Sequence, residues 1–243
     1  MAGKRVIVAI PVRMNASRLP GKPLVDLGGR FLVLRVVECV LACAAVDQCV
    51  VITDDERVRD VVASAGFSVL YDPRRARTGS DRIAAALPEL DGALDEDGVV
   101  VNVQGDQPDL DPAALAALIA HMHAHPSCGM ATLSAPLLGP AEDRARVKVV
   151  VDHTGRALYF SRSPIPVGGP HRVHLGIYAF RPSILRTMAS LPTGTLEASE
   201  SLEQLRLLEH GVPIDVLPWP RAWSSIDLPE DVTRWTRARA AVG

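Results

Sequence analysis

The first two thirds of the chain alternate between short apolar runs and longer stretches with helical spacing, and this alternation constrains the fold more than any other feature. The expected strands lie at 5–10, 48–53, 68–70 and 99–103. The expected helices lie at 31–45, 55–65, 80–90 and 111–124. Such alternation indicates βαβ units and a mostly parallel sheet. The run "VVVN" is apolar at successive positions, as a strand covered on both faces should be.

The last third is richer in strands. Four are expected, in the stretches "GMATLSAPL", "VKVVVD", "ALYFSR" and "HLGIYAFR". Helices are expected at 183–191, 199–210 and 230–241. The pattern contains no repeat and no low-complexity linker, so we predict an α/β fold in which a mixed or antiparallel extension is fused to a mostly parallel sheet.

Composition excludes several classes of protein. With 243 residues, 48% of them hydrophobic and 22% charged, the chain can bury a sizeable core. The net charge of −2 gives no basic field that would attract nucleic acid or an anionic membrane. We see neither a signal peptide nor a membrane-spanning run, and expect a cytoplasmic protein.

Cysteines and histidines give no metal-binding spacing along the sequence. Cys39, Cys43, Cys49 and Cys128 lack a CxxC pair, so we expect reduced, mostly buried thiols. The tract "HMHAHP" at 121–126 falls at an expected helix end, where alternate histidines point in different directions. We interpret these as surface histidines and do not count them as ligands.

The loop after the first strand, "PVRMNASRLPGKPL", concentrates groups that bind phosphate. Arg13 and Arg18 supply guanidinium groups, Ser17 a hydroxyl and Lys22 an ammonium group, and Gly21 lets the backbone approach a ligand closely. Ligands bind beyond the carboxyl ends of strands in open α/β sheets, which is where this loop lies. It is neither a Walker A loop nor a GxGxxG turn. The alternative is a solvated basic loop stiffened by its prolines.

Three further motifs follow strands or begin helices. "VNVQGDQP" places Asp106 beside Gln104 and Gly105 at a strand end, a suitable position for a magnesium ligand, although a polar turn would read the same way. "TGSDR" at 78–82 and "SSIDLPEDV", which contains Asp227, each begin a helix. Helix capping is the open alternative for both.

Taken in order, these motifs resemble those of the CMP-Kdo synthetases, the 3-deoxy-manno-octulosonate cytidylyltransferases. The matching stretches are "IPVRMNASRLPGKPL", "ITDDERV", "TGSDRIA", "VVNVQGDQP", "MATLSAPL", "VKVVVD", "ALYFSRSPIP", "HLGIYAFR", "SLEQLRLLEHG" and "IDLPEDV". The resemblance implies a Rossmann-like nucleotidyltransferase fold with a dimerisation extension. It also implies a homodimer that transfers CMP from CTP to an acidic acceptor, with magnesium and with release of pyrophosphate.

The resemblance also assigns roles to residues and segments. The nucleotide-binding positions match Arg13, Ser17, Arg18, Lys22, Thr78, Ser80, Arg82, Gln104 and Gly105. The acceptor-binding positions match Gln104, Arg162, His174, Tyr178, Glu203 and Gln204. Asp106 and Asp227 would bind magnesium and, with Lys22, act in catalysis. Within a single domain, 1–130 would form the nucleotide core, 131–220 the acceptor and dimerisation part, and 221–243 the metal loop and last helix.

Several departures from the family's pattern concern the acceptor. Ala16 replaces a hydroxyl, Gln107 replaces a carboxylate, and "RAWSSID" replaces a glycine-rich approach to Asp227. Only the seven residues 167–173 separate "SRSPIP" from "HLGIY", where the family has a longer segment. A long sugar acid needs a roomy, hydroxyl-lined pocket. We therefore expect a small, highly charged acceptor, phosphonoformate first, held through Arg162 and His174.

Two alternatives stay open. One is Kdo itself, the acceptor of the family. The other is a non-catalytic nucleotide-binding protein, against which Lys22, Asp106 and Asp227 argue, because binding alone would not need a second metal ligand.

Overall fold

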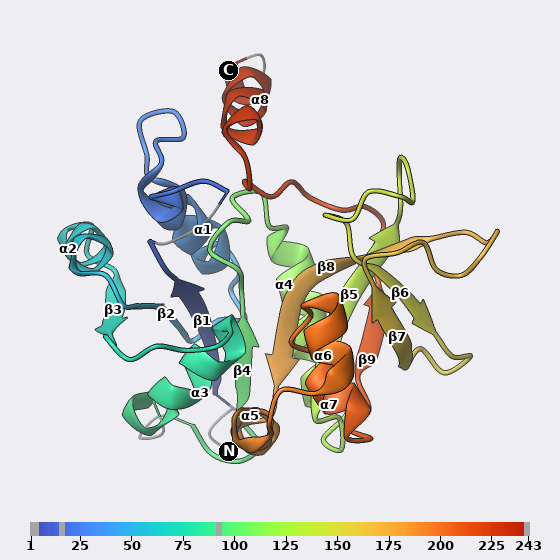
Figure 1. Ribbon diagram of the computed structural model, residues 1–243. Helices are drawn as coiled ribbons and strands as arrows, with labels where there is room; N and C mark the ends of the chain where they lie inside the picture. Colours follow the sequence, from blue (N-terminus) through green and yellow to red (C-terminus); the bar gives the residue numbers. More distant parts are fainter. Residues whose placement is uncertain (1–4, 15–17, 91–93, 241–243) are drawn as a thin grey trace.

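One sheet runs through the molecule and separates two layers of helices (Figure 1). The computed structural model describes residues 5–14, 18–90 and 94–240. Its strands are β1 Val6–Val12, β2 Gln48–Thr53, β3 Ser68–Tyr71, β4 Val99–Asn102, β5 Met130–Pro136, β6 Lys148–Val151, β7 Ala157–Ser161, β8 Arg172–Phe180 and β9 Asp215–Pro218. Its helices are α1 Leu32–Leu41, α2 Glu56–Ser64, α3 Gly79–Leu90, α4 Pro112–Ala124, α5 Pro182–Ser190, α6 Thr195–Glu200, α7 Leu205–Glu209 and α8 Pro229–Ala240, with a 3₁₀ turn, η1, at Lys22–Leu24.

The sheet combines a parallel part with a mixed part. Its strand order is β3-β2-β1-β4-β8-β5-β9, and the first four of these strands are parallel. Strand β8 runs antiparallel to both β4 and β5, while β9 is parallel to β5. The β6–β7 hairpin joins the sheet beside β8. The predicted α/β class, with a mixed extension on a mostly parallel sheet, is confirmed.

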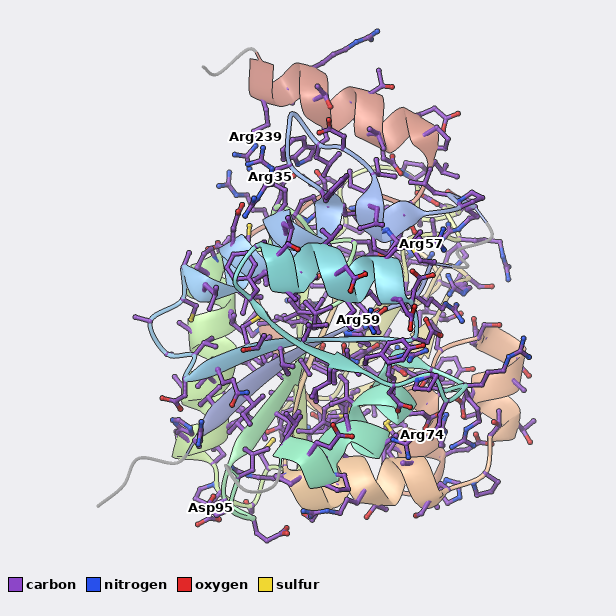
Figure 2. All side chains as sticks on the ribbon, turned by 90° about the vertical axis from the view of Figure 1, so that its left-hand side faces the viewer. Arg35, Arg57, Arg59, Arg74, Asp95 and Arg239 are labelled. Carbon is purple, nitrogen blue, oxygen red and sulfur yellow. The ribbon has the colours of Figure 1, made fainter. Side chains whose placement is uncertain are left out.

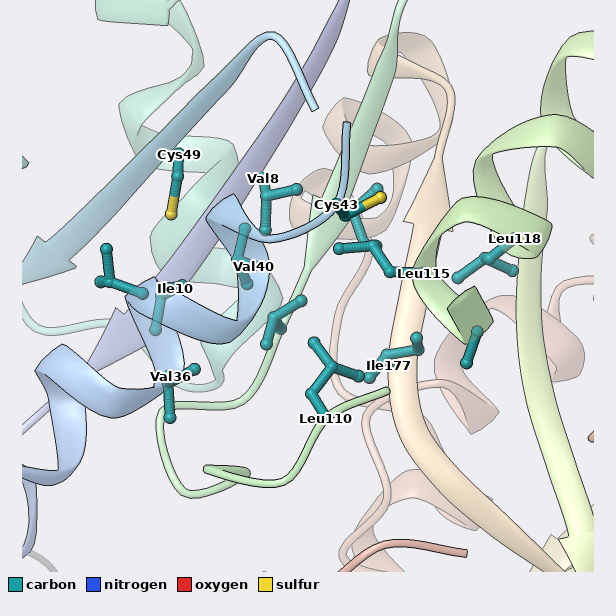
Figure 3. Close-up of a cluster of buried hydrophobic side chains, with 14 of the residues drawn as sticks. Val8, Ile10, Val36, Val40, Cys43, Cys49, Leu110, Leu115, Leu118 and Ile177 are labelled. Atoms are coloured by element: carbon teal, nitrogen blue, oxygen red, sulfur yellow. The ribbon is translucent and has the colours of Figure 1, made fainter. Parts of the chain in front are cut away.

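The central strands are buried on both faces because helices cover both. In β1, Val6, Val8 and Ile10 pack with α1, α2 and α4, whereas Ile7 and Ala9 pack with α3 and α5. Figure 3 shows part of the first cluster, in which Val36 and Val40 of α1 lie beside Val8 and Ile10 of β1, and Leu115 of α4 lies beside Ile177 of β8. Consecutive apolar residues are required for such a strand, which explains the uninterrupted apolar runs of the sequence.

Most predicted elements lie within a few residues of the observed ones. Asp55 and Asp111 cap α2 and α4, accepting hydrogen bonds of 2.9 Å from the backbone N–H groups of Arg57 and Ala113. The helix expected at 31–45 ends earlier, at Leu41. The predicted burial of the thiols is also found, since Cys43, Cys49 and Cys128 are buried and Cys39 is partly buried.

Two predictions in the last third were wrong. The single helix expected at 199–210 is two helices, α6 and α7, because Ser201 adopts a left-handed conformation with φ 54° and ends the first. Strand β9 was not expected at all. It is four residues long, ends at Pro218, and is specified by a parallel ladder with β5 rather than by a local pattern.

The last helix is fixed to the body of the molecule through Trp235. This side chain is buried in the first cluster, and its Nε1 donates to Asp109 Oδ1 at 3.0 Å. The guanidinium groups of Arg35 and Arg239 lie 5.7 and 5.1 Å from the ring centroid. Both arginines lie close to α8 in Figure 2. These contacts fix the position of the segment that precedes α8.

Across the described ranges, no helix has the length and apolar character needed to cross a membrane.

Candidate active site

The loop after β1 places Lys22 at the carboxyl edge of the sheet. Gly21 has a φ of 73°, a conformation that other residues rarely adopt, and its N–H donates to Met14 O at 3.1 Å. The turn η1 then begins at Lys22, with Pro23 in its first turn. Arg13 is exposed at the start of the loop. The expectation for Ser17, like that for Ala16, falls outside the described residues.

Lys22 lies between the two aspartates expected to bind metal. Its Nζ is 2.6 Å from Asp106 Oδ2 and 3.0 Å from Asp227 Oδ1. Arg18 Nη2 also lies 3.0 Å from Asp227 Oδ1. The structure thus brings together four charged residues from three segments that are widely separated in the sequence.

The two aspartates are positioned by backbone contacts. Gly105, just before Asp106, lies so close to β1 that a Cβ there would be 2.3 Å from Val12 Cγ1, so the loop requires glycine. Ile226 donates its N–H to Asp106 O at 2.9 Å, which joins the two aspartate segments. Asp231 in α8 accepts from Asp227 N and Leu228 N at 3.0 and 2.9 Å. These bonds hold the two carboxylates on either side of the lysine.

The electrostatics of this group keep Lys22 positively charged beside two carboxylates. Burial raises the pKa of Asp106, although the neighbouring Lys22 opposes this. Burial works to lower the pKa of Lys22, but Asp106 and Asp227 outweigh it and the pKa is raised, so Lys22 is an ammonium. Asp106 and Asp227 face this ammonium, and Arg18 adds a second positive charge beside Asp227. The carboxylates of Asp106 and Asp227 are hard oxygen donors of the kind that magnesium prefers. The residues present therefore fit the ion that the family resemblance implies.

The start of α3 is linked to β4 and to the segment between α6 and α7 by a chain of hydrogen bonds. Gln104 Nε2 donates to Asn102 Oδ1 at 3.3 Å, and Asn102 Nδ2 donates to Ser80 Oγ at 3.0 Å. Ser80 in turn donates through Oγ and N to the Glu203 carboxylate at 2.9 and 3.1 Å. These hydrogen bonds therefore join residues expected to bind the nucleotide to one expected to bind the acceptor.

Two residues of the "TGSDR" motif have structural partners instead. Thr78 Oγ1 accepts from Asp81 N at 3.2 Å, so it caps α3, as the open alternative expected. Arg82 is buried and donates to Asp54 Oδ2 at 2.6 Å and to Asp72 O at 3.2 Å. These contacts join α3 to the ends of β2 and β3 and direct the Arg82 guanidinium to groups other than the Lys22 cluster.

The expected acceptor residues form a buried, polar group. His174 Nε2 lies 2.9 Å from Thr132 Oγ1, and its ring contacts those of Phe160 and Tyr178. Tyr178 OH donates to Gln204 Oε1 at 3.0 Å. Burial lowers the pKa of His174 to about 3, so the imidazole is neutral at pH 7. Because Thr132 Oγ1 donates to Ile177 O, His174 Nε2 donates to Thr132, and the neutral ring has only Nδ1 left as an acceptor rather than the positive charge expected from the sequence.

Arg162 uses its guanidinium within the protein. Nε donates to Glu200 O at 2.8 Å, and Nη1 and Nη2 donate to the carbonyls of Arg144 and Ser201 at 3.1 and 3.3 Å. Three backbone acceptors fix its orientation. Arg162 thus connects the β7–β8 link to the carboxyl end of α6.

Sequence reasoning missed Asn102 and Thr132. Both are completely buried polar residues inside strands. A polar side chain in an otherwise apolar strand is the signal that could have found them, because a buried polar group needs a partner. Here the partners are Ser80, Gln104 and His174.

Known proteins resemble this chain over nearly its whole length. The family model described as "Cytidylyltransferase" matches residues 7–214. A 3-deoxy-manno-octulosonate cytidylyltransferase of Anaeromyxobacter sp. (strain Fw109-5) is 45% identical, over 99% of this chain and 98% of the relative. An 8-amino-3,8-dideoxy-manno-octulosonate cytidylyltransferase of Shewanella piezotolerans (strain WP3 / JCM 13877) is 41% identical, over 98% of this chain and 99% of the relative.

Solved structures also resemble this chain over nearly its whole length. A CMP:2-keto-3-deoxy-manno-octonic acid synthetase complexed with CTP superposes with a TM-score of 0.92 at 33% identity, covering 98% of this chain and 100% of that one. A 4-diphosphocytidyl-2C-methyl-D-erythritol synthase has a TM-score of 0.67 at 16% identity, covering 98% of this chain and 99% of that one. The second likeness concerns the fold alone.

Proposed function

Because this chain belongs to the cytidylyltransferase family, with 3-deoxy-manno-octulosonate cytidylyltransferases among its relatives, we propose that it transfers CMP from CTP to a sugar acid of the 3-deoxy-octulosonate type. The observation that carries the proposal is the placement of Lys22 between Asp106 and Asp227 at the carboxyl edge of β1 and β4. A phosphate-binding cation next to paired carboxylates is what transfer of a nucleotidyl group requires. The full-length match to sugar-acid cytidylyltransferases supports this acceptor class over the phosphonate expected from the sequence.

The proposed reaction follows from the charges. An oxygen of the acceptor attacks the α-phosphorus of CTP in line, the bond to the β-phosphate oxygen breaks, and pyrophosphate leaves with that electron pair. Lys22, with Arg13 and Arg18, would bind the phosphates and stabilise the charge on the leaving group. Asp106 and Asp227 would hold magnesium, which supplies Lewis-acid neutralisation of phosphate oxygens when bound.

The acceptor would bind beside the buried polar group. Among the described residues, Gln204 Nε2 is a buried donor without a hydrogen-bond partner. An unpaired buried donor is costly unless a ligand satisfies it. We therefore assign the acceptor carboxylate to Gln204 Nε2, with Tyr178 fixing the orientation of that amide through its 3.0 Å bond.

Phosphonoformate is a second candidate acceptor. It is favoured by one observation, the short link of seven residues at 167–173 between the "SRSPIP" and "HLGIY" motifs. A shorter link leaves less chain to surround a long sugar, and phosphonoformate also carries a carboxylate that Gln204 could bind.

One experiment tests the function and separates the two acceptors. The protein is incubated with CTP, magnesium and either Kdo or phosphonoformate, and the CMP adduct is followed by phosphorus NMR. We expect CMP-Kdo and pyrophosphate. A product from phosphonoformate alone would replace the first candidate by the second, and no product from either acid would overturn both. Replacing CTP by UTP should lower turnover at least about tenfold, equivalent to about 1.4 kcal/mol.

We also propose a homodimer formed through the β6–β7 region. Large apolar side chains are exposed there, Leu138 in the link after β5, Leu158 in β7 and Val167 in the link after β7. Light scattering should give a dimer for the native chain and a monomer for Leu158→Glu. Leu41→Glu, at an exposed leucine at the end of α1, is the control and should stay dimeric. The reduced thiols and the use of CTP fit an enzyme of the cytoplasm.

A further inference from the structure

Three side chains that the proposed reaction does not use meet near the ends of α4, β5 and β9. His121 is in the last turn of α4, Cys128 lies just before β5, and Asp215 is the first residue of β9. One ligand atom from each lies within 4.8 Å of the other two. His121 Nε2 and Asp215 Oδ2 are 2.9 Å apart. A nitrogen, a sulfur and an oxygen that can each bind a metal therefore share one small volume.

This cluster lies at the sheet edge opposite the candidate active site. Strand β8 is antiparallel to both β4 and β5, so β5 runs in the direction of β4 and starts at the same edge. Strand β9 is parallel to β5 and starts there too. Asp106 follows the carboxyl end of β4, whereas Cys128 and Asp215 are at the amino ends of their strands (Figure 1). The two clusters are thus separated by the length of the strands.

We propose that His121, Cys128 and Asp215 form a zinc-binding site that ties α4 to β5 and β9. An imidazole nitrogen, a thiolate and a carboxylate oxygen are the ligands that Zn²⁺ uses in proteins. A thiolate and a carboxylate together balance the two positive charges of the ion. Sulfur and nitrogen ligands also disfavour magnesium and calcium, which prefer oxygen. Three protein ligands leave the fourth tetrahedral position for water.

The surroundings support the binding of a cation. The carboxyl end of α4, a helix of 13 residues, lies beside His121 and carries the negative end of the helix dipole. His121 and Asp215 side chains are 20% and 26% exposed, so an ion could enter without unfolding. Arg156 Nε lies 3.9 Å from Asp215 Oδ1 and opposes the cation, but its side chain is 61% exposed and free to turn toward solvent.

A metal-free explanation accounts for the same distances. His121 and Asp215 could simply form an ion pair that joins α4 to β9, with Cys128 buried beside them. The two explanations differ in one property, because only a metal site brings the thiolate into the first coordination shell. Sulfur ligation has a spectroscopic signature, so the difference can be measured directly.

The decisive test is cobalt substitution in the full-length protein. The chain is freed of metal with a chelator and titrated with Co²⁺ under reducing conditions, in an Asp106→Asn, Asp227→Asn background that removes the magnesium ligands. We expect one Co²⁺ per chain, visible-range bands typical of tetrahedral cobalt, a near-ultraviolet thiolate-to-cobalt band, and displacement by one equivalent of Zn²⁺. Absence of the thiolate band at saturating Co²⁺ would overturn the proposal.

Matched variants locate the site. Cys128→Ser should abolish the thiolate band, and His121→Ala should weaken Co²⁺ binding at least about tenfold. His123→Ala is the control, since His123 is exposed on the same helix, and should bind as the parent does. Circular dichroism verifies that each variant is folded. A thiolate band that persists in Cys128→Ser would assign the metal to another cysteine and also overturn the proposal. Because catalysis depends on the opposite edge, this result is independent of the acceptor assay.

Discussion

The two sides of the candidate active site are built from different kinds of group. On the nucleotide side, Lys22, Asp106 and Asp227 are charged, partly exposed, and paired with one another. On the acceptor side, His174 and Tyr178 are buried and uncharged, and each is hydrogen-bonded to a neighbour in the protein. Paired charges can exchange partners when phosphates and a metal arrive, whereas buried dipoles are fixed beforehand. We infer that the first side supplies catalysis and the second supplies selectivity.

The strongest test of this difference is to remove a negative charge from the nucleotide side. Asp106→Asn and Asp227→Asn should each lower turnover by about a thousandfold or more, because an amide is a weaker magnesium ligand and carries no charge. Chelation of magnesium should have the same effect on the native enzyme. Pyrophosphate release gives the rate. Asp60→Asn is the control, since Asp60 pairs with Arg59 on the surface of α2 rather than with the lysine. A fully active Asp227→Asn enzyme would show that this residue is not a metal ligand.

Removing the cation should have a smaller effect. Lys22→Ala should lower turnover about a hundredfold, because Arg13 and Arg18 still offer positive charge to the phosphates. The fold should be retained, since the loop lies outside the core. Steady-state kinetics measure the loss, with Arg30→Ala as a control, because Arg30 pairs with Glu38 at the surface. Turnover near that of the native enzyme would mean that the loop does not bind the phosphates.

A change on the acceptor side should act on one substrate only. Tyr178→Phe removes the donor to Gln204 Oε1 and leaves that amide free to turn. We expect the KM for the acceptor to rise about tenfold, and the KM for CTP to stay the same, since a lost hydrogen bond at a buried site costs about 1–3 kcal/mol. Equal changes in both KM values would show that the two sides of the site are not separable.

The smallest expected effect is on the pH dependence of stability. The pKa of His174 is about 3 when folded and about 6.5 when unfolded. Below pH of about 6.5 the unfolded chain therefore binds a proton that the folded chain does not, and stability is lost as pH falls toward about 3, by up to about 1.4 kcal/mol per pH unit. His174→Gln lacks this loss.

Urea unfolding of the native chain and His174→Gln at pH 7 and pH 5 measures the difference. The native chain should lose about 1–2 kcal/mol more than the variant over this interval. Burial raises the folded pKa of Asp106 and Glu203, which has the opposite sign, but both residues are present in both proteins. His123→Gln should behave as the native chain does. Equal losses in all three proteins would mean that His174 is protonated in the fold.

The sequence predicts the nucleotide side better than the acceptor side for a physical reason. Strands β1, β2 and β4 and helices α2 and α4 follow from local periodicity and capping, and ligands bind at the ends of such strands wherever they occur. Lys22 and Asp106 could therefore be expected to meet, whereas only the family resemblance joins Asp227, which precedes a helix, to them. The guanidinium of Arg162 depends instead on carbonyls that only the folded chain brings near.

The cluster of His121, Cys128 and Asp215, like the contacts of Arg162, depends on segments that only the folded chain brings together. Two of its members are near in sequence, but Asp215 begins β9, a strand that no local pattern predicts. The spacing of the histidine tract alone predicts surface histidines and gives no sign that Asp215 lies beside His121. A site that depends on the pairing of strands far apart in the sequence therefore cannot be predicted from local sequence patterns.

The attachment of α8 through Trp235 has a consequence for how the enzyme is made. Asp227 is held by Asp231 in α8, and α8 is held by Trp235 against Asp109. Ribosomes synthesise the chain from its amino end, so the loop of Lys22 and the strand before Asp106 emerge long before the helix that fixes Asp227. A nascent chain therefore contains Lys22 and Asp106 before it contains the helix that fixes Asp227, so the three residues can come together only after α8 has been made.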